Sequence, residues 1–524
     1  MNRNVSYVIA AGLAFAAAPA GAQSFATENP VLRRIWEEGT RNSQLERLGQ
    51  ALSDSIGPRL TASPGIRAGN QWLIDTYRSW GITARNEQYG TFRGWRRGYS
   101  HADLVQPRVR SLEGTMLAWS PGTNGPVTAP VVALPDFADQ AAFEAWLPSI
   151  RGKLVAISMP QPTCRPDDNW KQFATDSSFA RMKDARTAAT AAWTARIQRT
   201  GVAARDLAPR LEQAGAAGVL TSLWSGGWGV DRIFNARTHQ VPTFDLSCED
   251  YGLVYRLAEH HQGPVVRLDA QSEELGELPV FNTIAEIRGS QKPNEYIVLS
   301  AHFDSWDGSS GSTDNGTGTI TMMEALRILR TVYPNPKRTI VVGHWSGEEQ
   351  GLNGSRAYVK DHPAVVNGLQ ALFNQDNGTG RVTSISMQGL TGAAGFMGKW
   401  LALVPSEIGK QITLDNPGVP STGGSDYASF ICAGAPAFGL SSLSWDYGAY
   451  TWHTTRDTYD KIVWDDVRNN AVLTAMLVYL ASEEPQRVPR DRRTVFPVNT
   501  QTGQPFSWPA CTDAARTTSQ STRM

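Results

Sequence analysis

The sequence predicts an α/β protein with a mixed, mostly parallel sheet flanked by helices. After about residue 280, short runs of β-branched and aliphatic residues, such as residues 296–301 (YIVLSA), alternate with segments of helical apolar spacing, such as residues 320–329 (ITMMEALRIL). Polar loops rich in Gly and Ser separate the two kinds of segment. This strand–loop–helix rhythm is typical of a parallel sheet whose connections are helices.

The expected elements of this region follow one another in chain order. Strands are expected at residues 295–301, 338–345, 369–375 and 436–443, and helices at residues 315–331, 353–361, 395–404 and 465–482. Upstream, residues 30–90 combine helical patterns with polar loops. Downstream, a tail rich in Pro, Arg and Thr follows residue 484.

Residues 126–275 have a different pattern of expected strands and helices from the rest of the chain. Short strands are expected at residues 152–157, 241–246 and 265–268, and a helix that runs into a strand at residues 211–220. An Ala- and Arg-rich insertion at residues 165–210 is expected to be helical, with its charges in solvent. The whole segment, about 150 residues, is long enough to fold as a domain of its own.

Length and charge limit the class of protein. A chain of 524 residues is too long for a single core, so two or more domains are expected. A hydrophobic content of 41% and 17 Trp indicate a globular protein. Lys plus Arg and Asp plus Glu both number 49, so no global field favours binding to nucleic acid or to an anionic membrane.

The N-terminus is typical of a secretory signal peptide. A cationic start (MNRN), an apolar run at residues 5–18 and an Ala-Gly-Ala site before Gln23 predict its removal. The alternative is a retained membrane anchor, although the run is short for a span of roughly 20 residues. We therefore expect a periplasmic or secreted protein that is free of the membrane after cleavage. Export permits disulfides, but the sequence does not choose among the three pairings of four cysteines. These are Cys164, Cys248, Cys432 and Cys511.

Acidic residues and histidines follow the ends of successive expected strands. The carboxyl ends of parallel strands meet at one edge of a sheet, where open α/β proteins bind their ligands. Carboxylates together with two imidazoles suit zinc, and two divalent metals can share one carboxylate. In chain order the residues are His302, Asp304, Asp314, Glu348, Glu349, Asp376 and His453.

The remaining histidines call for simpler explanations. His344 lies inside an expected strand with no acid beside it, which predicts a packed or hydrogen-bonded side chain. No acidic neighbour is expected for the other five, which are His101, His239, His260, His261 and His362.

The order H-x-D, D, E-E, D, H resembles that of the co-catalytic zinc exopeptidases, a family that includes bacterial leucyl aminopeptidases and carboxypeptidase Q. Residues 302–307 (HFDSWD), residues 345–350 (WSGEEQ) and His453 with Asp457 downstream match motifs of that family. The likeness spans roughly residues 30–482. It implies that residues 126–275 are an inserted protease-associated domain.

The resemblance also implies a ligand set for two zinc ions. His302, Asp314 and Asp376 would hold one metal, and Asp314, Glu349 and His453 the other. Asp314 would bridge the pair, as would the hydroxide that attacks the peptide bond. In this family the peptide bond that follows the bridging Asp is cis, so Asp314–Asn315 is expected to be cis.

Three further residues receive catalytic roles from the same resemblance. Asp304 would orient His302, and Glu348 would be the general base that takes a proton from water. Tyr427, in residues 423–427 (GGSDY), would donate to the oxyanion, although a Tyr of the core fits that position nearly as well. Asn315 departs from the Asp of many relatives without removing a ligand.

The function expected from these residues is exopeptidase action on small peptides, as a dipeptidase, carboxypeptidase or aminopeptidase. A glutaminyl-cyclase-like acyltransferase and a non-catalytic binding relative are the alternatives, and a homodimer stays open. The expected division of the chain is a signal peptide (1–22), the first part of the peptidase domain (23–125), the inserted domain (126–275), the catalytic domain (276–484) and a tail (485–524).

Overall fold

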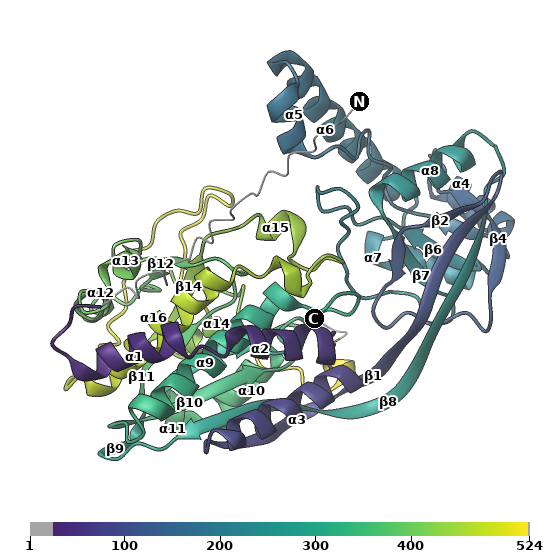
Figure 1. The fold of residues 1–524 in the computed structure, drawn as a ribbon. Coiled ribbons are helices and arrows are strands. Elements are labelled where there is room, and N and C mark those ends of the chain that lie inside the picture. Colours follow the sequence, from purple (N-terminus) through teal and green to yellow (C-terminus); the bar gives the residue numbers. More distant parts are fainter. Residues whose placement is uncertain (1–24, 522–524) are drawn as a thin grey trace, which may run out of the picture.

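The computed structural model describes residues 25–521 and has one extended mixed sheet with helices on both faces (Figure 1). In the part predicted to be catalytic, the strands β14 (Ala437–Ser442), β11 (Leu369–Asn374), β9 (Lys292–His302) and β10 (Arg338–Trp345) lie side by side in this order and are parallel. Strand β8 (Val265–Ile287) adds to β10 in the antiparallel sense. The predicted mixed, mostly parallel sheet is therefore confirmed.

The helices of this part also lie where the apolar spacing predicts them. They are α9 (Thr317–Val332), α10 (Asn353–Asp361), α12 (Ala393–Leu401) and α16 (Trp464–Glu483). Period-2 alternation in β9 divides the core between the two faces of the sheet. Ile297 and Leu299 belong to the cluster that includes α9 and α16, whereas Val298 belongs to the cluster on the face of α10.

A long two-stranded ribbon joins the catalytic sheet to a second unit. Strand β1 (Thr83–Gln106) pairs with β8 in the antiparallel sense along most of its length, and both strands run from one unit to the other (Figure 1). The sequence predicts only residues 265–268 of this ribbon. Only 7 of the 24 residues of β1 are buried, and many of the others are polar, so β1 lacks the apolar pattern expected of a strand. Because β8 is continuous across residue 275, the boundary expected there falls within a strand.

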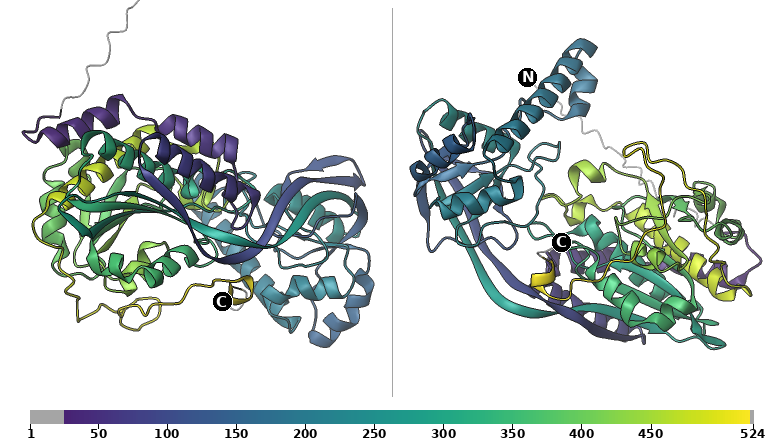
Figure 2. Two further views of the ribbon diagram at one scale, coloured as in Figure 1. Left: turned by 90° about the horizontal axis from the view of Figure 1, so that it is seen from below. Right: turned by 180° about the vertical axis from the view of Figure 1, so that it is seen from behind.

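The second unit contains a smaller parallel arrangement. Its strands are β4 (Val127–Ala133), β5 (Leu154–Ala156), β6 (Gly218–Thr221) and β7 (Thr243–Leu246), paired in that order. Helix α6 (Asp176–Arg199) projects from it together with α5 (Asp167–Phe173), as Figure 1 and the right view of Figure 2 show. Within α6 only Met182 is buried, which agrees with the expected solvated helical insertion.

The four cysteines form two disulfides, which selects one of the three pairings that the sequence leaves open. Cys164 is bonded to Cys248 in the second unit, and Cys432, at the end of α14 (Tyr427–Cys432), is bonded to Cys511 in the tail. The tail thus stays against the catalytic part. No helix in residues 25–521 is both long and apolar enough to cross a membrane. The predicted signal peptide lies outside the described residues.

Candidate metal centre

The predicted ligands meet at the carboxyl edge of the sheet. His302 is the last residue of β9, Glu349 follows β10, and Asp376 follows β11. Asp314 lies in the loop before α9, and His453 lies in the loop after α15 (Tyr447–Tyr450). These three strands are neighbours in the sheet, so their ends deliver side chains to one place.

The five side chains form two groups that share one carboxylate. His302 Nε2 lies 3.3 Å from Asp314 Oδ1 and 3.2 Å from Asp376 Oδ1. His453 Nε2 lies 3.2 Å from Asp314 Oδ2 and 2.9 Å from Glu349 Oε2. The two oxygens of Asp314 therefore face different histidines.

The residues present fit a pair of metal ions. Ligand atoms about 2.0–2.2 Å from a tetrahedral zinc lie roughly 3.3–3.5 Å apart, which is close to the spacing of His302, Asp314 and Asp376. Each group of three has its ligand atoms within 4.8 Å of one another. Asp314 Oδ2 and Glu349 Oε1 are buried and accept no hydrogen bond. Buried carboxylates without donors are costly unless a cation or a proton compensates them.

Glu348 lies beside this set without completing either of the two groups. It forms a third close group with His302 and Glu349. It also lines a cavity of about 530 Å³, which includes the five predicted ligands. Burial raises the pKa of Glu348 well above its usual range, and the carboxylates of Asp376 and Glu349 add to the effect. Glu348 can therefore hold a proton at the cavity wall, and in its ionised form it can take one up there.

The same carboxylates also shift the pKa values of the two histidines. Burial lowers the pKa of His453, but Glu349 and Asp314 outweigh it and raise the value to about 10. The pKa of His302 is likewise raised well above its usual range, against burial, chiefly by Asp376. Protons on the two histidines therefore compensate the acids when no cation does.

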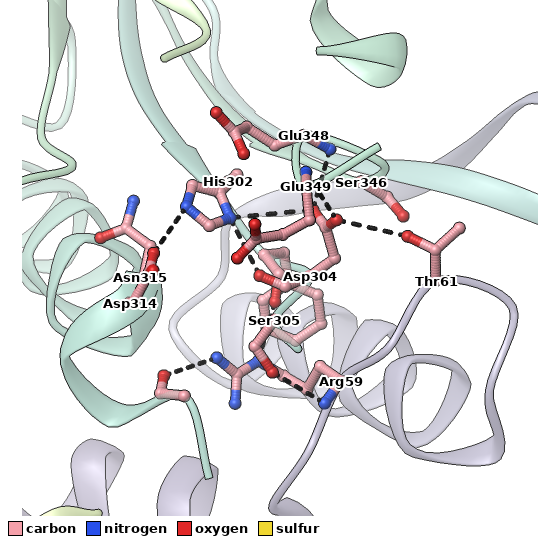
Figure 3. Close-up of polar contacts among 12 residues, drawn as sticks. Arg59, Thr61, His302, Asp304, Ser305, Asp314, Asn315, Ser346, Glu348 and Glu349 are labelled. Atoms are coloured by element: carbon pink, nitrogen blue, oxygen red, sulfur yellow. Dashed lines mark hydrogen bonds and ion pairs between the residues drawn. The ribbon is translucent and has the colours of Figure 1, made fainter. Parts of the chain in front are cut away.

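Asp304 contacts its partners differently from the expectation. Its backbone carbonyl, not its carboxylate, accepts from His302 Nδ1 at 2.9 Å, whereas the carboxylate oxygen lies 3.8 Å from that nitrogen. The carboxylate instead accepts from the backbone N–H groups of Glu348 at 3.2 Å and Glu349 at 3.3 Å (Figure 3). Asp304 therefore positions the loop of the two glutamates as well as the imidazole.

The peptide bond between Asp314 and Asn315 is cis, as predicted. Asp457 accepts from the backbone N–H groups of Thr313 at 2.7 Å and Asp314 at 2.9 Å. The Asn315 amide donates to the carbonyl of Gln375 at 2.9 Å. An aspartate at position 315 could not donate in this way, so the departure from the family pattern joins the loops that carry Asp314 and Asp376.

Arg59 is a site residue that the sequence does not reveal. Its side chain is completely buried and donates to carbonyls at both ends of the loop after β9, as Figure 3 shows in part. The acceptors are Phe303 at 2.8 Å, Ser310 at 2.7 Å, Gly311 at 2.9 Å and, from its own turn, Gly57 at 3.0 Å. No pattern around residues 56–65 distinguishes this arginine from an exposed turn residue.

Tyr427 does not reach the cavity wall, whereas Tyr447 does. The Tyr427 ring contacts Gly439 and packs against the apolar cluster that includes Phe430. Burial raises the pKa of both tyrosines. The oxyanion role expected for Tyr427 therefore stays a prediction, and Tyr447 is a second tyrosine, which lines the cavity.

Outside the site, His344 behaves as predicted and two other histidines do not. The Nε2 atom of His344 lies 2.8 Å from the Tyr77 hydroxyl in the core. His101 has an acidic neighbour in Asp103, and His362 has one in Glu87, each at 2.9 Å. The expectation that these two histidines have no acidic neighbour is wrong. His101 and Asp103 lie two residues apart on one face of β1, and the packing of α10 against β1 brings Glu87 to His362.

The protein should lose stability below neutral pH through His344. Burial lowers its pKa to about 3, so the unfolded chain binds this proton below about pH 6.5 and the folded chain does not. The free energy of unfolding should fall by about 1.4 kcal/mol per pH unit between about 6.5 and 3 from this group alone. Denaturation of His344→Gln, with chelator present, should show a correspondingly flatter pH dependence than the wild type. Parallel curves would contradict the assignment.

The sequence and fold of this region match known peptidases. The profile of peptidase family M28 matches residues 282–478. Mouse carboxypeptidase Q is 26% identical over 455 residues, which cover 86% of this chain and 88% of that protein. A peptidase M28 precursor from Shewanella amazonensis superposes with a TM-score of 0.64 at 24% identity, covering 88% of this chain and 97% of that one. The zinc aminopeptidase BSAP from Bacillus subtilis gives a TM-score of 0.55 at 17% identity, with coverage of 86% and 97%. Residues 282–478 thus match the model of peptidase family M28, and the protein is a peptide hydrolase.

Proposed function

We propose that the protein is a zinc-dependent exopeptidase that uses two zinc ions and acts on small peptides. The observation that supports it most is the placement of Asp314, whose two oxygens face His302 and His453 separately. His302 and Asp376 would complete one metal site, and His453 and Glu349 the other. Zinc aminopeptidases of the same fold support the choice of metal.

When bound, zinc supplies Lewis-acid polarisation of the scissile carbonyl and lowers the pKa of water. Residues of the chain carry out proton transfer, positioning and contact with the oxyanion. Glu348 accepts the proton of the attacking water and returns it to the leaving amine. The Asp304 carboxylate accepts from the backbone N–H of Glu348, and this contact keeps the Glu348 carboxylate at the cavity wall. Tyr447 is the hydroxyl available for the oxyanion.

A wall from the second unit favours exopeptidase action. Its segment 231–234 lies directly against the loop of His453. The Ile233 N–H donates to the His453 carbonyl at 2.7 Å, and the Phe234 ring lies 5.2 Å from the imidazole. Arg232 donates to the carbonyl of Trp452, a residue that lines the cavity. A cavity walled in this way admits a chain terminus more readily than a polypeptide passing through.

Dipeptides should be hydrolysed at a rate far above that of internal peptide bonds. The test is to incubate the zinc-loaded enzyme with an unstructured protein blocked at both termini and to follow fragments by mass spectrometry. A dipeptide in the same tube is the positive control, and added chelator is the negative control. Internal cleavage at a rate comparable to dipeptide hydrolysis would contradict the exopeptidase proposal.

Three further expectations belong to this proposal. Residues 126–275 would be a protease-associated domain, and the protein would be exported to the periplasm or medium. The complete set of candidate ligands, with Glu348, argues against a non-catalytic relative. The set of two metal groups also disfavours the acyltransferase alternative, which would use a single zinc. Elemental analysis separates one zinc from two per chain.

A further inference from the structure

Among residues 25–521, one cationic side chain at the site has no hydrogen-bond or ion-pair partner. Arg356 lies on α10 and is half-buried, and its guanidinium makes no ion pair or hydrogen bond within the described residues. It lines the cavity that holds the predicted ligands. It is the single Lys or Arg among the described residues of that lining.

The surroundings of Arg356 favour an anion that comes from outside the chain. Burial lowers the pKa of the guanidinium, while Asp426 and Glu348 oppose this effect from a distance greater than an ion pair. A half-buried guanidinium loses hydration without gaining the bidentate partner that its planar fork fits. A carboxylate is the partner that a peptide can bring.

Arg356 also connects the site to a second cavity. This cavity, about 270 Å³, shares Leu352 and Arg356 with the first and is walled by tail residues 509–513. The bond between Cys432 and Cys511 holds that wall against α14. The other cation of this cavity, Lys360, is already paired with Asp513 at 2.6 Å. Arg356 is thus the unpaired charge at the junction of the two cavities.

We propose that Arg356 binds the free α-carboxylate of the substrate, on the leaving-group side of the scissile bond. The inference rests on the proposed exopeptidase function. It decides whether the enzyme recognises the carboxyl end or the amino end of its substrate. A guanidinium that reads the carboxyl end selects dipeptides and short peptides cut next to their C-terminus. An aminopeptidase that trims long chains from the amino end would have no use for it.

The test compares Leu-Leu with its amide, Leu-Leu-NH2, on the zinc-loaded wild type and Arg356→Gln. The wild type should prefer the free acid in kcat/KM. Arg356→Gln should lower the acid-to-amide ratio by about 10- to 100-fold, mainly through KM, the range for a charged hydrogen bond. Lys360→Met removes an equal charge one turn along the same helix and should leave the ratio as it is. Arg356→Lys should recover part of the preference.

A second pair of substrates separates the two sources of a carboxylate. If Arg356 read an acidic side chain instead, Leu-Glu-NH2 would be preferred over Leu-Gln-NH2, and Arg356→Gln would remove that preference while sparing the acid-to-amide ratio of Leu-Leu. That result would overturn the inference. So would an equal ratio in wild type and Arg356→Gln.

A binding measurement tests this inference independently of the proposed function, because it does not require hydrolysis. Calorimetry with leucine and leucinamide should show tighter binding of the acid to the wild type, and Arg356→Gln should lose the difference. If no peptide is hydrolysed but this difference is present, the exopeptidase proposal fails and the carboxylate site stands. If peptides are hydrolysed and leucine binds no better than leucinamide, the carboxylate site fails alone.

Discussion

Replacing Glu348 by glutamine should lower kcat by roughly two to four orders of magnitude while both zinc ions stay bound. Glutamine has the shape of glutamate but cannot accept the proton of the attacking water. The contacts that hold this loop come from the backbone N–H groups of Glu348 and Glu349 to Asp304, so the substitution leaves them in place. The measurements are steady-state rates on a dipeptide and zinc content by elemental analysis.

Glu349→Ala is the matched control for this experiment. It changes the adjacent residue on the same loop but removes a carboxylate that lies 2.9 Å from His453 Nε2. Zinc occupancy should fall in this variant, and activity should return in part when excess zinc is added. The assignments are wrong if Glu348→Gln empties the site, or if it turns over at the wild-type rate. They are also wrong if Glu349→Ala keeps both metals.

The placement of three candidate ligands at one edge of the sheet could be predicted, because each lies at or after the end of a strongly patterned strand. His302 is the last residue of β9, and Glu349 and Asp376 lie in the loops that follow β10 and β11. A parallel sheet aligns such strand ends whatever their separation in sequence. The same local patterns predict the boundaries of β9, β10, α9 and α16 to within a few residues. These features depend on periodicity, which a single sequence contains.

What could not be predicted depends on contacts between distant segments. Strand β1 is largely polar and only 7 of its 24 residues are buried, so its pairing with β8 is what makes it a strand. The choice between Tyr427 and Tyr447 depends on which way two loops turn, and nothing in their composition decides it. Asp304 carries a carboxylate near His302, but the fold uses its backbone carbonyl for the imidazole. Arg59 lies 244 positions before the first carbonyl it binds on the loop after β9.

Replacing Arg59 by methionine should lower the free energy of unfolding by about 3–5 kcal/mol, the range for breaking a buried charged network. Methionine fills much of the space but donates nothing. Four carbonyls would each lose a donor, among them those of Phe303 and Gly311 at the two ends of the loop that contains Asp304. Burial already lowers the pKa of Arg59 to about 10, against the pull of Asp457, Asp304 and Asp314. Urea denaturation with chelator present measures the loss without a contribution from metal.

Arg338→Met is the control that separates stability from the site. Arg338 is equally buried, but its guanidinium donates to the carbonyls of Ala481, Ser482 and Glu484, at the end of α16 and away from the metal centre. Both variants should lose similar stability. Only Arg59→Met should also bind zinc more weakly in its folded fraction, by about 10- to 100-fold, as expected when the support of a ligand is lost. Wild-type zinc affinity in folded Arg59→Met would mean that other contacts hold the loop. An equal loss of affinity in Arg338→Met would mean that zinc binding follows global stability and not the position of the loop.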